Sequence, residues 1–156
     1  MGENFMIHRL SMEDENIIKE VLTLQQEAYR VEAELIDFMD LPPLRDDRES
    51  LKASHEAFYG FYVEEELAGI ISFEIEENIL DICRVAVKPT FFRRGIAEKM
   101  LSYIIEIHPR IHKLLVSTGS NNFPAVRFYK KHGFSKYEEQ EIREGLVISK
   151  FEKTIN

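Results

Sequence analysis

The apolar pattern in the middle of the chain changes period and predicts three consecutive strands. Segments 58–63 (FYGFYV), 67–76 (LAGIISFEIE) and 79–87 (ILDICRVAV) are rich in aromatic and β-branched residues and are separated by short charged turns. In the second segment apolar and polar residues alternate from Ile71 to Glu76, which predicts a half-buried antiparallel strand. The third segment is nearly continuous in apolar residues, which favours a central position in a sheet.

The first third of the chain has a different pattern. Segment 5–10 (FMIHRL) predicts an opening strand, and apolar residues at helical spacing then run from Ile17 to Met39. Pro42 ends that pattern, because proline cannot continue a helix. Asp47 is a helix-capping residue type and predicts a further short helix through about Ala53.

The second half alternates helical and strand patterns. Apolar residues paired at spacing four predict a helix at 96–105, and KLLVST (113–118) predicts a strand. Segment 121–133 has a capping Asn, an early Pro and a Gly exit, which is typical of a helix. Two last strands, at about 134–142 and 146–151, are joined by a tight turn.

This element order predicts an α/β (α+β) fold built as a single domain over residues 1–156. We expect a mixed, mostly antiparallel sheet with helices on both faces. The strands at 79–87 and 113–118 are separated by one helix, so we expect them to be parallel neighbours.

Composition and charge exclude some classes of protein. The formal net charge is −8, which argues against a general nucleic-acid binder. No apolar run reaches the roughly 20 residues that span a bilayer, and no signal-peptide pattern opens the chain, so we expect a cytoplasmic protein without membrane contact. The single cysteine, Cys83, suits a reducing compartment and is interpreted as a small core residue.

No metal site is expected. His108 and His112 are four residues apart, but Pro109 interrupts the helix that would bring them together. No other cluster has the ligand spacing of a zinc site.

A basic turn precedes the helix at 96–105. Arg93 and Arg94 are followed by Gly95, between an apolar strand and a helix. The first turn of a helix offers backbone N–H groups without partners, and such a turn can hold a phosphate. The alternative is an ordinary turn with two arginines in solvent.

Two motifs resemble the GNAT superfamily of N-acetyltransferases. The first is Val87-x-Pro89 followed by Arg93-Arg94-Gly95-Ile96-Ala97 at a helix start. The second is Asn122-x-x-Ala125-x-x-Phe128-Tyr129-x-Lys131-x-Gly133-Phe134. The element order resembles the GNAT fold over nearly the whole chain. One departure is Phe92, which stands where the family usually has Gln or Arg.

The resemblance implies an acetyl-CoA site. The turn at Arg93, Arg94, Gly95, Ile96 and Ala97 would hold the pyrophosphate, and the small residues there would let phosphate oxygens approach the backbone. In addition, the backbone of two central-strand residues and two side chains of the second motif would contact the cofactor: Val85, Val87, Asn122 and Lys131. An exposed surface lysine is an equally good interpretation of Lys131.

The resemblance also implies roles in the transfer. Tyr129 would protonate the leaving thiolate, and the N–H of Val87 would stabilise the oxyanion. Asp81 stands where one branch of the family carries a catalytic glutamate and would accept the proton of the amine through water. Tyr129 as a packing residue and Asp81 as a solvent-exposed residue are the alternatives. Other candidate bases are Glu32, Glu34, Glu74, Glu76 and ordered water.

The resulting hypothesis is an acetyl-CoA-dependent N-acetyltransferase acting by direct attack of a small-molecule or peptide amine. The alternative is a noncatalytic acyl-CoA-binding or sensing module of the same fold. Four acids of the early helices, Glu32, Glu34, Asp37 and Asp40, are candidates for a mouth that attracts a cationic acceptor. A homodimer is compatible with the resemblance.

Overall fold

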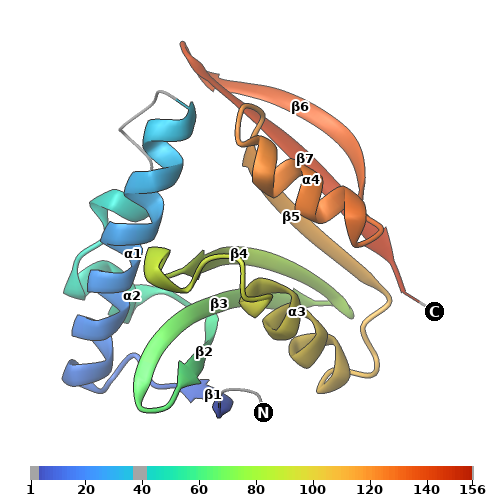
Figure 1. Cartoon of the computed structure of the whole chain (residues 1–156). Coiled ribbons are helices and arrows are strands. Elements are labelled where there is room, and N and C mark those ends of the chain that lie inside the picture. Colours follow the sequence, from blue (N-terminus) through green and yellow to red (C-terminus); the bar gives the residue numbers. More distant parts are fainter. Residues whose placement is uncertain (1–3, 37–41, 156) are drawn as a thin grey trace.

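The computed structural model describes residues 4–36 and 42–155, and in these ranges seven strands form one mixed sheet (Figure 1). The strands are β1 (Phe5–Leu10), β2 (Ala57–Val63), β3 (Glu66–Glu76), β4 (Ile79–Val87), β5 (Lys113–Gly119), β6 (Ser135–Arg143) and β7 (Leu146–Thr154). Their order is β1-β2-β3-β4-β5-β7-β6, and only β4 and β5 are parallel neighbours. The predicted mixed, mostly antiparallel sheet with β4 at its centre is confirmed.

Helices cover both faces of this sheet, as predicted. The helical elements are α1 (Glu15–Ile36), η1 (Pro42–Arg45), α2 (Arg48–Ala53), η2 (Pro89–Phe91), α3 (Ile96–Glu106) and α4 (Phe123–Lys131). One apolar core lies under α1 and α2 and includes Ile18, Leu51 and Ile70. The other lies under α3 and α4 and includes Met100 and Tyr129. None of the helices in the described ranges is both long and apolar enough to cross a bilayer.

The short helix α2 has the predicted cap. The Asp47 carboxylate accepts a hydrogen bond from the Ser50 N–H at 2.9 Å, and the Ser50 hydroxyl accepts one from the Asp47 N–H at 2.9 Å. This reciprocal pair satisfies two N–H groups that the helix itself cannot.

The prediction that β3 is half-buried is wrong for most of the strand. From Leu67 to Phe73 every residue is buried, because helices cover both sides of the sheet there. Ser72, expected to face solvent, is fully buried and donates its hydroxyl to Glu56 at 2.6 Å. The last part of the strand extends beyond the helices, and Ile75 is 42% exposed.

A buried ionic network anchors η1 and α2 to the sheet. Arg84 of β4 donates to Asp46 at 2.6 Å, to Glu56 at 2.9 Å and to the side-chain carbonyl of Gln25 at 2.8 Å. The side chains of Arg84, Asp46 and Glu56 are only 11%, 13% and 14% exposed. Because each charge is paired, the strand tolerates an arginine in its middle.

The interpretation of Cys83 as a core residue is also wrong. Cys83 is exposed on β4, between the buried Ile82 and the partly buried Arg84. The register of β4 against β3 shifts at this point, with Ile82 opposite Phe73 and Arg84 opposite Ser72. Cys83 is therefore the extra residue of a β-bulge, and its side chain leaves the core.

The parallel pairing of β4 with β5 is short. It joins Ile79–Ile82 to residues 113–116, and neither strand pairs with the other beyond that point. β4 nevertheless continues to Val87 and β5 to Gly119, and the two strands diverge in Figure 1. The backbone of β4 after Ile82 thus has a neighbouring strand, β3, on one side only.

We expect Arg84→Met to lower the free energy of unfolding by about 3–5 kcal/mol, because it leaves two carboxylates poorly solvated and without their cation. Lys88→Met is the matched control, since Lys88 pairs with the half-exposed Glu66 and its loss should cost less than about 1 kcal/mol. Urea unfolding of both variants measures the difference. Equal, small losses would show that the Arg84 network contributes little to stability.

Candidate functional site

The candidate site lies where β4 and β5 have parted. Val85 and Val87 are in the part of β4 that β5 does not reach, and on the other side they pair with Ile71 and Gly69 of β3. Their side chains pack on the core under α3 and α4, which also contains Ile96 and Tyr129. Residues of both predicted motifs therefore meet in one cluster on this face of the sheet.

The basic turn has the geometry of an anion-binding nest. Arg93 has φ +66° and Gly95 has φ +74°, so two residues of three are in the left-handed region. Gly95 is the N-cap of α3, and no side chain caps the helix. Backbone N–H groups in such a conformation converge on one point, where they can hold a phosphate.

Space is available above this turn. A Cβ placed on Gly95 would meet no atom of the described residues within 4 Å, so a ligand can approach the backbone closely. Gly69 has the opposite environment, since a Cβ there would lie 3.0 Å from Cγ2 of Ile96. The missing side chain of Gly69 lets the first turn of α3 sit directly on β3. The residues present fit the pyrophosphate of acetyl-CoA.

The side chains of the turn differ in their surroundings. Arg93 and Arg94 are exposed, and the Arg94 guanidinium lies 4.9 Å from the centre of the Phe91 ring. Ile96 is buried and Ala97 partly buried. Phe92 is 44% exposed, and its phenyl ring has no hydrogen-bond donor to replace the Gln or Arg of the family.

Asn122 connects α4 with α1. It is the N-cap of α4, where its side-chain oxygen accepts a hydrogen bond from the Ala125 N–H at 3.3 Å. Its side-chain NH₂ donates to Glu32 of α1 at 2.5 Å. The two residues are 90 positions apart in the sequence. The predicted contact of Asn122 with the cofactor stays a prediction.

Tyr129 lies two helical turns after Asn122, on the same side of α4. It is 6% exposed, and its ring packs against Phe128, Phe134 and Phe151 at centroid distances of 5.3, 5.3 and 6.1 Å. Burial, and secondly the negative charge of Glu32, raise the pKa of Tyr129. The hydroxyl therefore keeps its proton at neutral pH, as a proton donor must.

Sequence reasoning missed Tyr29. Its hydroxyl donates to the backbone carbonyl of Val85 at 3.3 Å, in the part of β4 that does not pair with β5. Burial, and then the charge of Glu32, raise its pKa. Tyr29 packs on the core of the α1 face, whereas Tyr129 belongs to the core of the opposite face. The charge of Glu32 acts on both hydroxyls. The signal in the sequence that could have identified Tyr29 was helical spacing, because positions three apart put Tyr29 and Glu32 on one side of α1.

Asp81 lies in a different environment from Tyr129. It is exposed, in the part of β4 that pairs on both sides, opposite Glu74 of β3 and Leu115 of β5. Burial by the sheet, followed by the negative charges of Glu74 and Glu56, raises the pKa of Asp81. The role of Asp81 as base stays a prediction.

The remaining predicted residues are spread over the surface. Lys131 is exposed in the last turn of α4, and Glu34 and Glu76 are also exposed. Asp37 and Asp40 lie outside the described residues.

One group of potential metal ligands occurs in the described ranges. Ligand atoms of Glu56, Glu74 and Cys83 lie within 4.8 Å of one another. Both oxygens of Glu56 already accept hydrogen bonds from Arg84. The pairing with a cation leaves this carboxylate poorly suited to a metal, and the expectation of no metal site stays a prediction.

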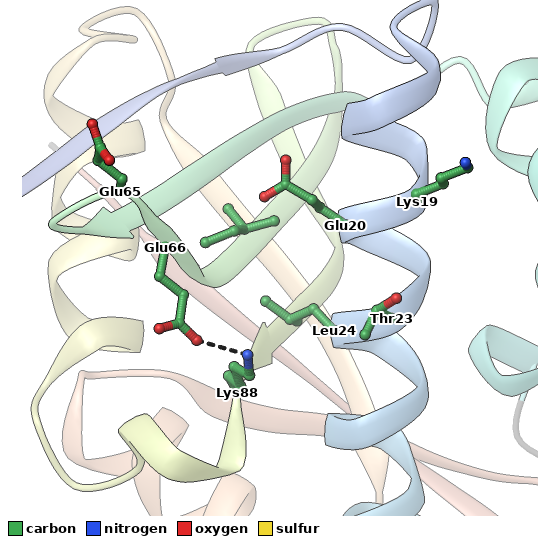
Figure 2. Close-up of a pocket in the computed structure, with 8 residues that line it drawn as sticks. Lys19, Glu20, Thr23, Leu24, Glu65, Glu66 and Lys88 are labelled. Carbon is green, nitrogen blue, oxygen red and sulfur yellow. Dashed lines mark hydrogen bonds and ion pairs between the residues drawn. The ribbon is translucent and has the colours of Figure 1, made fainter.

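A surface pocket of about 430 Å³ lies between α1 and the β2–β3 hairpin (Figure 2). Leu24 and Leu67 form its apolar wall, and Lys88 pairs with Glu66 across it at 2.7 Å. None of the predicted site residues in the described ranges lines this pocket.

Comparison with known proteins gives both a family and a fold. Residues 18–134 match the model of the Acetyltransferase (GNAT) family. UPF0157 protein YqkA of Bacillus subtilis (strain 168) is 38% identical over 146 residues, which cover 94% of this chain and 43% of that protein. The chain thus spans less than half the length of this relative.

Two similar solved structures are N-acetyltransferases. The ribosomal-protein-S18-alanine N-acetyltransferase of Escherichia coli has a TM-score of 0.78 at 12% identity, with 98% of this chain and 95% of that chain covered. The PaiA N-acetyltransferase of Thermoplasma acidophilum, solved in complex with coenzyme A, has a TM-score of 0.78 at 19% identity, with 97% and 99% covered. The GNAT fold generally binds acetyl-CoA as the acetyl donor. Since the family model matches from within α1 to the end of the second motif, and the fold is that of solved acetyltransferases, this chain belongs to the GNAT acetyltransferase family.

Proposed function

We propose that this chain is an acetyl-CoA-dependent N-acetyltransferase that moves an acetyl group to a primary amine by direct attack. The observation that carries the proposal is the position of the buried Tyr129 in the same cluster as Val85 and Val87 of β4 and the first residue of α3. The turn proposed to bind phosphate and the proposed proton donor would then lie on one face of the parted strands.

Residues of the second half would hold the cofactor. The uncapped turn at Gly95 binds the pyrophosphate through backbone N–H groups, with Arg93 and Arg94 adding positive charge. At Val85 and Val87, the edge of β4 that no longer pairs with β5 offers backbone groups to the amide-rich pantetheine arm of the cofactor. Asn122 and Lys131 are placed by the family motif, at the arm and at the phosphoadenosine end respectively.

The reaction needs a proton acceptor for the amine, a donor for the oxyanion and a proton donor for the thiolate. Bound acetyl-CoA supplies the thioester that the amine attacks. Tyr129 donates the proton to the sulfur, and the N–H of Val87 stabilises the oxyanion. Asp81 is the candidate base from the family motif. Glu32 is the alternative, because its negative charge acts on the hydroxyl of Tyr129.

The acceptor is a small-molecule amine or a peptide amine. The two N-acetyltransferases of similar fold do not decide between these classes, because their identity to this chain is below 20%. Release of coenzyme A thiol across a panel of amines tests the activity directly. Binding of acetyl-CoA without transfer to any amine would favour the noncatalytic acyl-CoA-binding alternative.

Gly95→Val should weaken acetyl-CoA binding at least about tenfold, equivalent to about 1.4 kcal/mol, because its methyl groups occupy the space above the turn. Gly95→Ala is the control for backbone strain, since it shares the left-handed conformation but adds a single carbon. Titration calorimetry measures both affinities. Unchanged affinity in a folded Gly95→Val protein would exclude this turn as the phosphate site.

Tyr129→Phe should lower the rate of acetyl transfer by roughly 10²-fold, because it removes the proton donor and keeps the packed ring. Acetyl-CoA affinity and the melting temperature should change little. Tyr103→Phe removes a hydroxyl from α3, where the ring packs beside Tyr59, and serves as the control. Single-turnover kinetics provide the measurement, and an undiminished rate would assign Tyr129 to packing alone.

A further inference from the structure

Glu32 is a partly buried carboxylate without a cationic partner. Its only hydrogen bond in the described residues is the one it accepts from the Asn122 NH₂ at 2.5 Å. No lysine, arginine or histidine of residues 4–36 and 42–155 forms an ion pair with it. Proteins normally pair a carboxylate that is removed from water, so a cation is missing at this position.

Packing on one side and a hydrogen bond on the other fix the position of Glu32. Ala33, the next residue of α1, packs against Leu146 of β7 and Leu44 of η1. Asn122 joins Glu32 to the start of α4, the helix that carries Tyr129. Glu32 therefore lies between α1 and the start of α4, and its charge acts on the hydroxyl of the proposed proton donor.

We propose that Glu32 binds the ammonium group of the acceptor and takes its proton, and that the acceptors are primary amines without a neighbouring carboxylate. This inference rests on the proposed N-acetyltransferase function. An ammonium group supplies the missing positive charge. A carboxylate next to the nitrogen would be brought against Glu32 and repelled, so a free amino acid is disfavoured.

Protons and bonds balance in this scheme. One proton passes from the ammonium to the Glu32 carboxylate and then to solvent. The free amine forms the N–C bond while the C–S bond of the thioester breaks. Tyr129 gives its proton to the sulfur and regains one from the nitrogen as the amide forms.

The electrostatics agree with this role. Burial raises the pKa of Glu32 above that of an ordinary glutamate, although the hydrogen bond from Asn122 opposes the effect. A higher pKa makes the carboxylate a better proton acceptor near neutral pH. The charge of Glu32 acts on Tyr129, whereas that of Asp81 acts on Tyr137 of β6.

The first experiment compares Glu32→Gln with Glu27→Gln. Glutamine keeps an oxygen for Asn122 and removes the charge, and Glu27 is an exposed acid of the same helix to which no role at the site is assigned. The probes are spermidine and two matched pairs, tyramine with tyrosine and alaninamide with alanine, in which only the second member carries a carboxylate. The wild-type protein should prefer the first member of each pair by at least about tenfold in kcat/KM, an energy difference of about 1.4 kcal/mol.

Glu32→Gln should lower kcat/KM for the carboxylate-free amines by roughly 10²-fold, the scale of a lost general base, and should lose the preference within each pair. Its defect should shrink at high pH, where free amine no longer needs a base. Acetyl-CoA affinity should not change. Wild-type kinetics in Glu32→Gln, or an equal loss in Glu27→Gln, would overturn the inference.

Calorimetry keeps this inference separable from the proposed function. Tyramine, alaninamide and spermidine are titrated into protein saturated with coenzyme A, where no transfer can occur. Glu32→Gln should weaken their binding at least about tenfold. Binding of none of them to the wild-type protein, or equal binding to both proteins, would overturn the role of Glu32. Absence of transfer from bound acetyl-CoA would instead contradict the proposed function.

The pH dependence of stability gives a test without ligands. Because the folded state raises the pKa of Glu32, its ionised form costs folding free energy, and stability is lost as pH rises through the raised pKa. Glu32→Gln should therefore melt above the wild-type protein at pH 8, and the difference should shrink toward pH 4. A pH-independent difference for Glu32→Gln would mean that Glu32 is not an unpaired buried carboxylate.

Discussion

The short parallel pairing of β4 with β5 is the constraint on which the candidate site depends. The strands share hydrogen bonds over four residue pairs, and each then follows its other neighbour, β3 or β7. Past Ile82 the two strands are no longer paired, and the charge of Glu32 acts on Tyr29 of one core and on Tyr129 of the other. A longer pairing would leave no backbone edge for a ligand.

The sequence predicts those parts of the structure that depend on local chemistry. Gly95 and the capping Asn122 are recognisable because a turn and a helix start need particular residue types. The link between Glu32 and Asn122 is not recognisable, since it joins residues 90 positions apart through the packing of α1 and α4. The exposure of Cys83 also escapes prediction, because a single extra residue in β4 changes which side chains face the core.

The two partly buried acidic environments differ in how their charge is compensated. Glu56 is neutralised by Arg84, which also binds Asp46, so that network serves to hold α2 and η1 on the sheet. Glu32 has an amide as its partner and no cation in the described residues. Arg84, an arginine within the mostly apolar strand β4, was the sequence signal for the first environment. Rules such as the pairing of a buried charge are most often broken at functional sites. The lack of a cation at Glu32 agrees with a position at the candidate site.

The bulge at Cys83 determines the redox chemistry of the chain. Its thiol is exposed, yet partial desolvation by the sheet and the negative charges of Glu56, Asp81 and Glu74 raise its pKa to about 12. Only the thiolate attacks disulfides, oxidants or thioesters, and at pH 7 about one thiol in 10⁵ is ionised at such a pKa. Cys83 is thus a slow partner for disulfide formation between copies of the protein. It is equally slow to exchange with a thioester, so this thiol is a poor site for an acyl-enzyme.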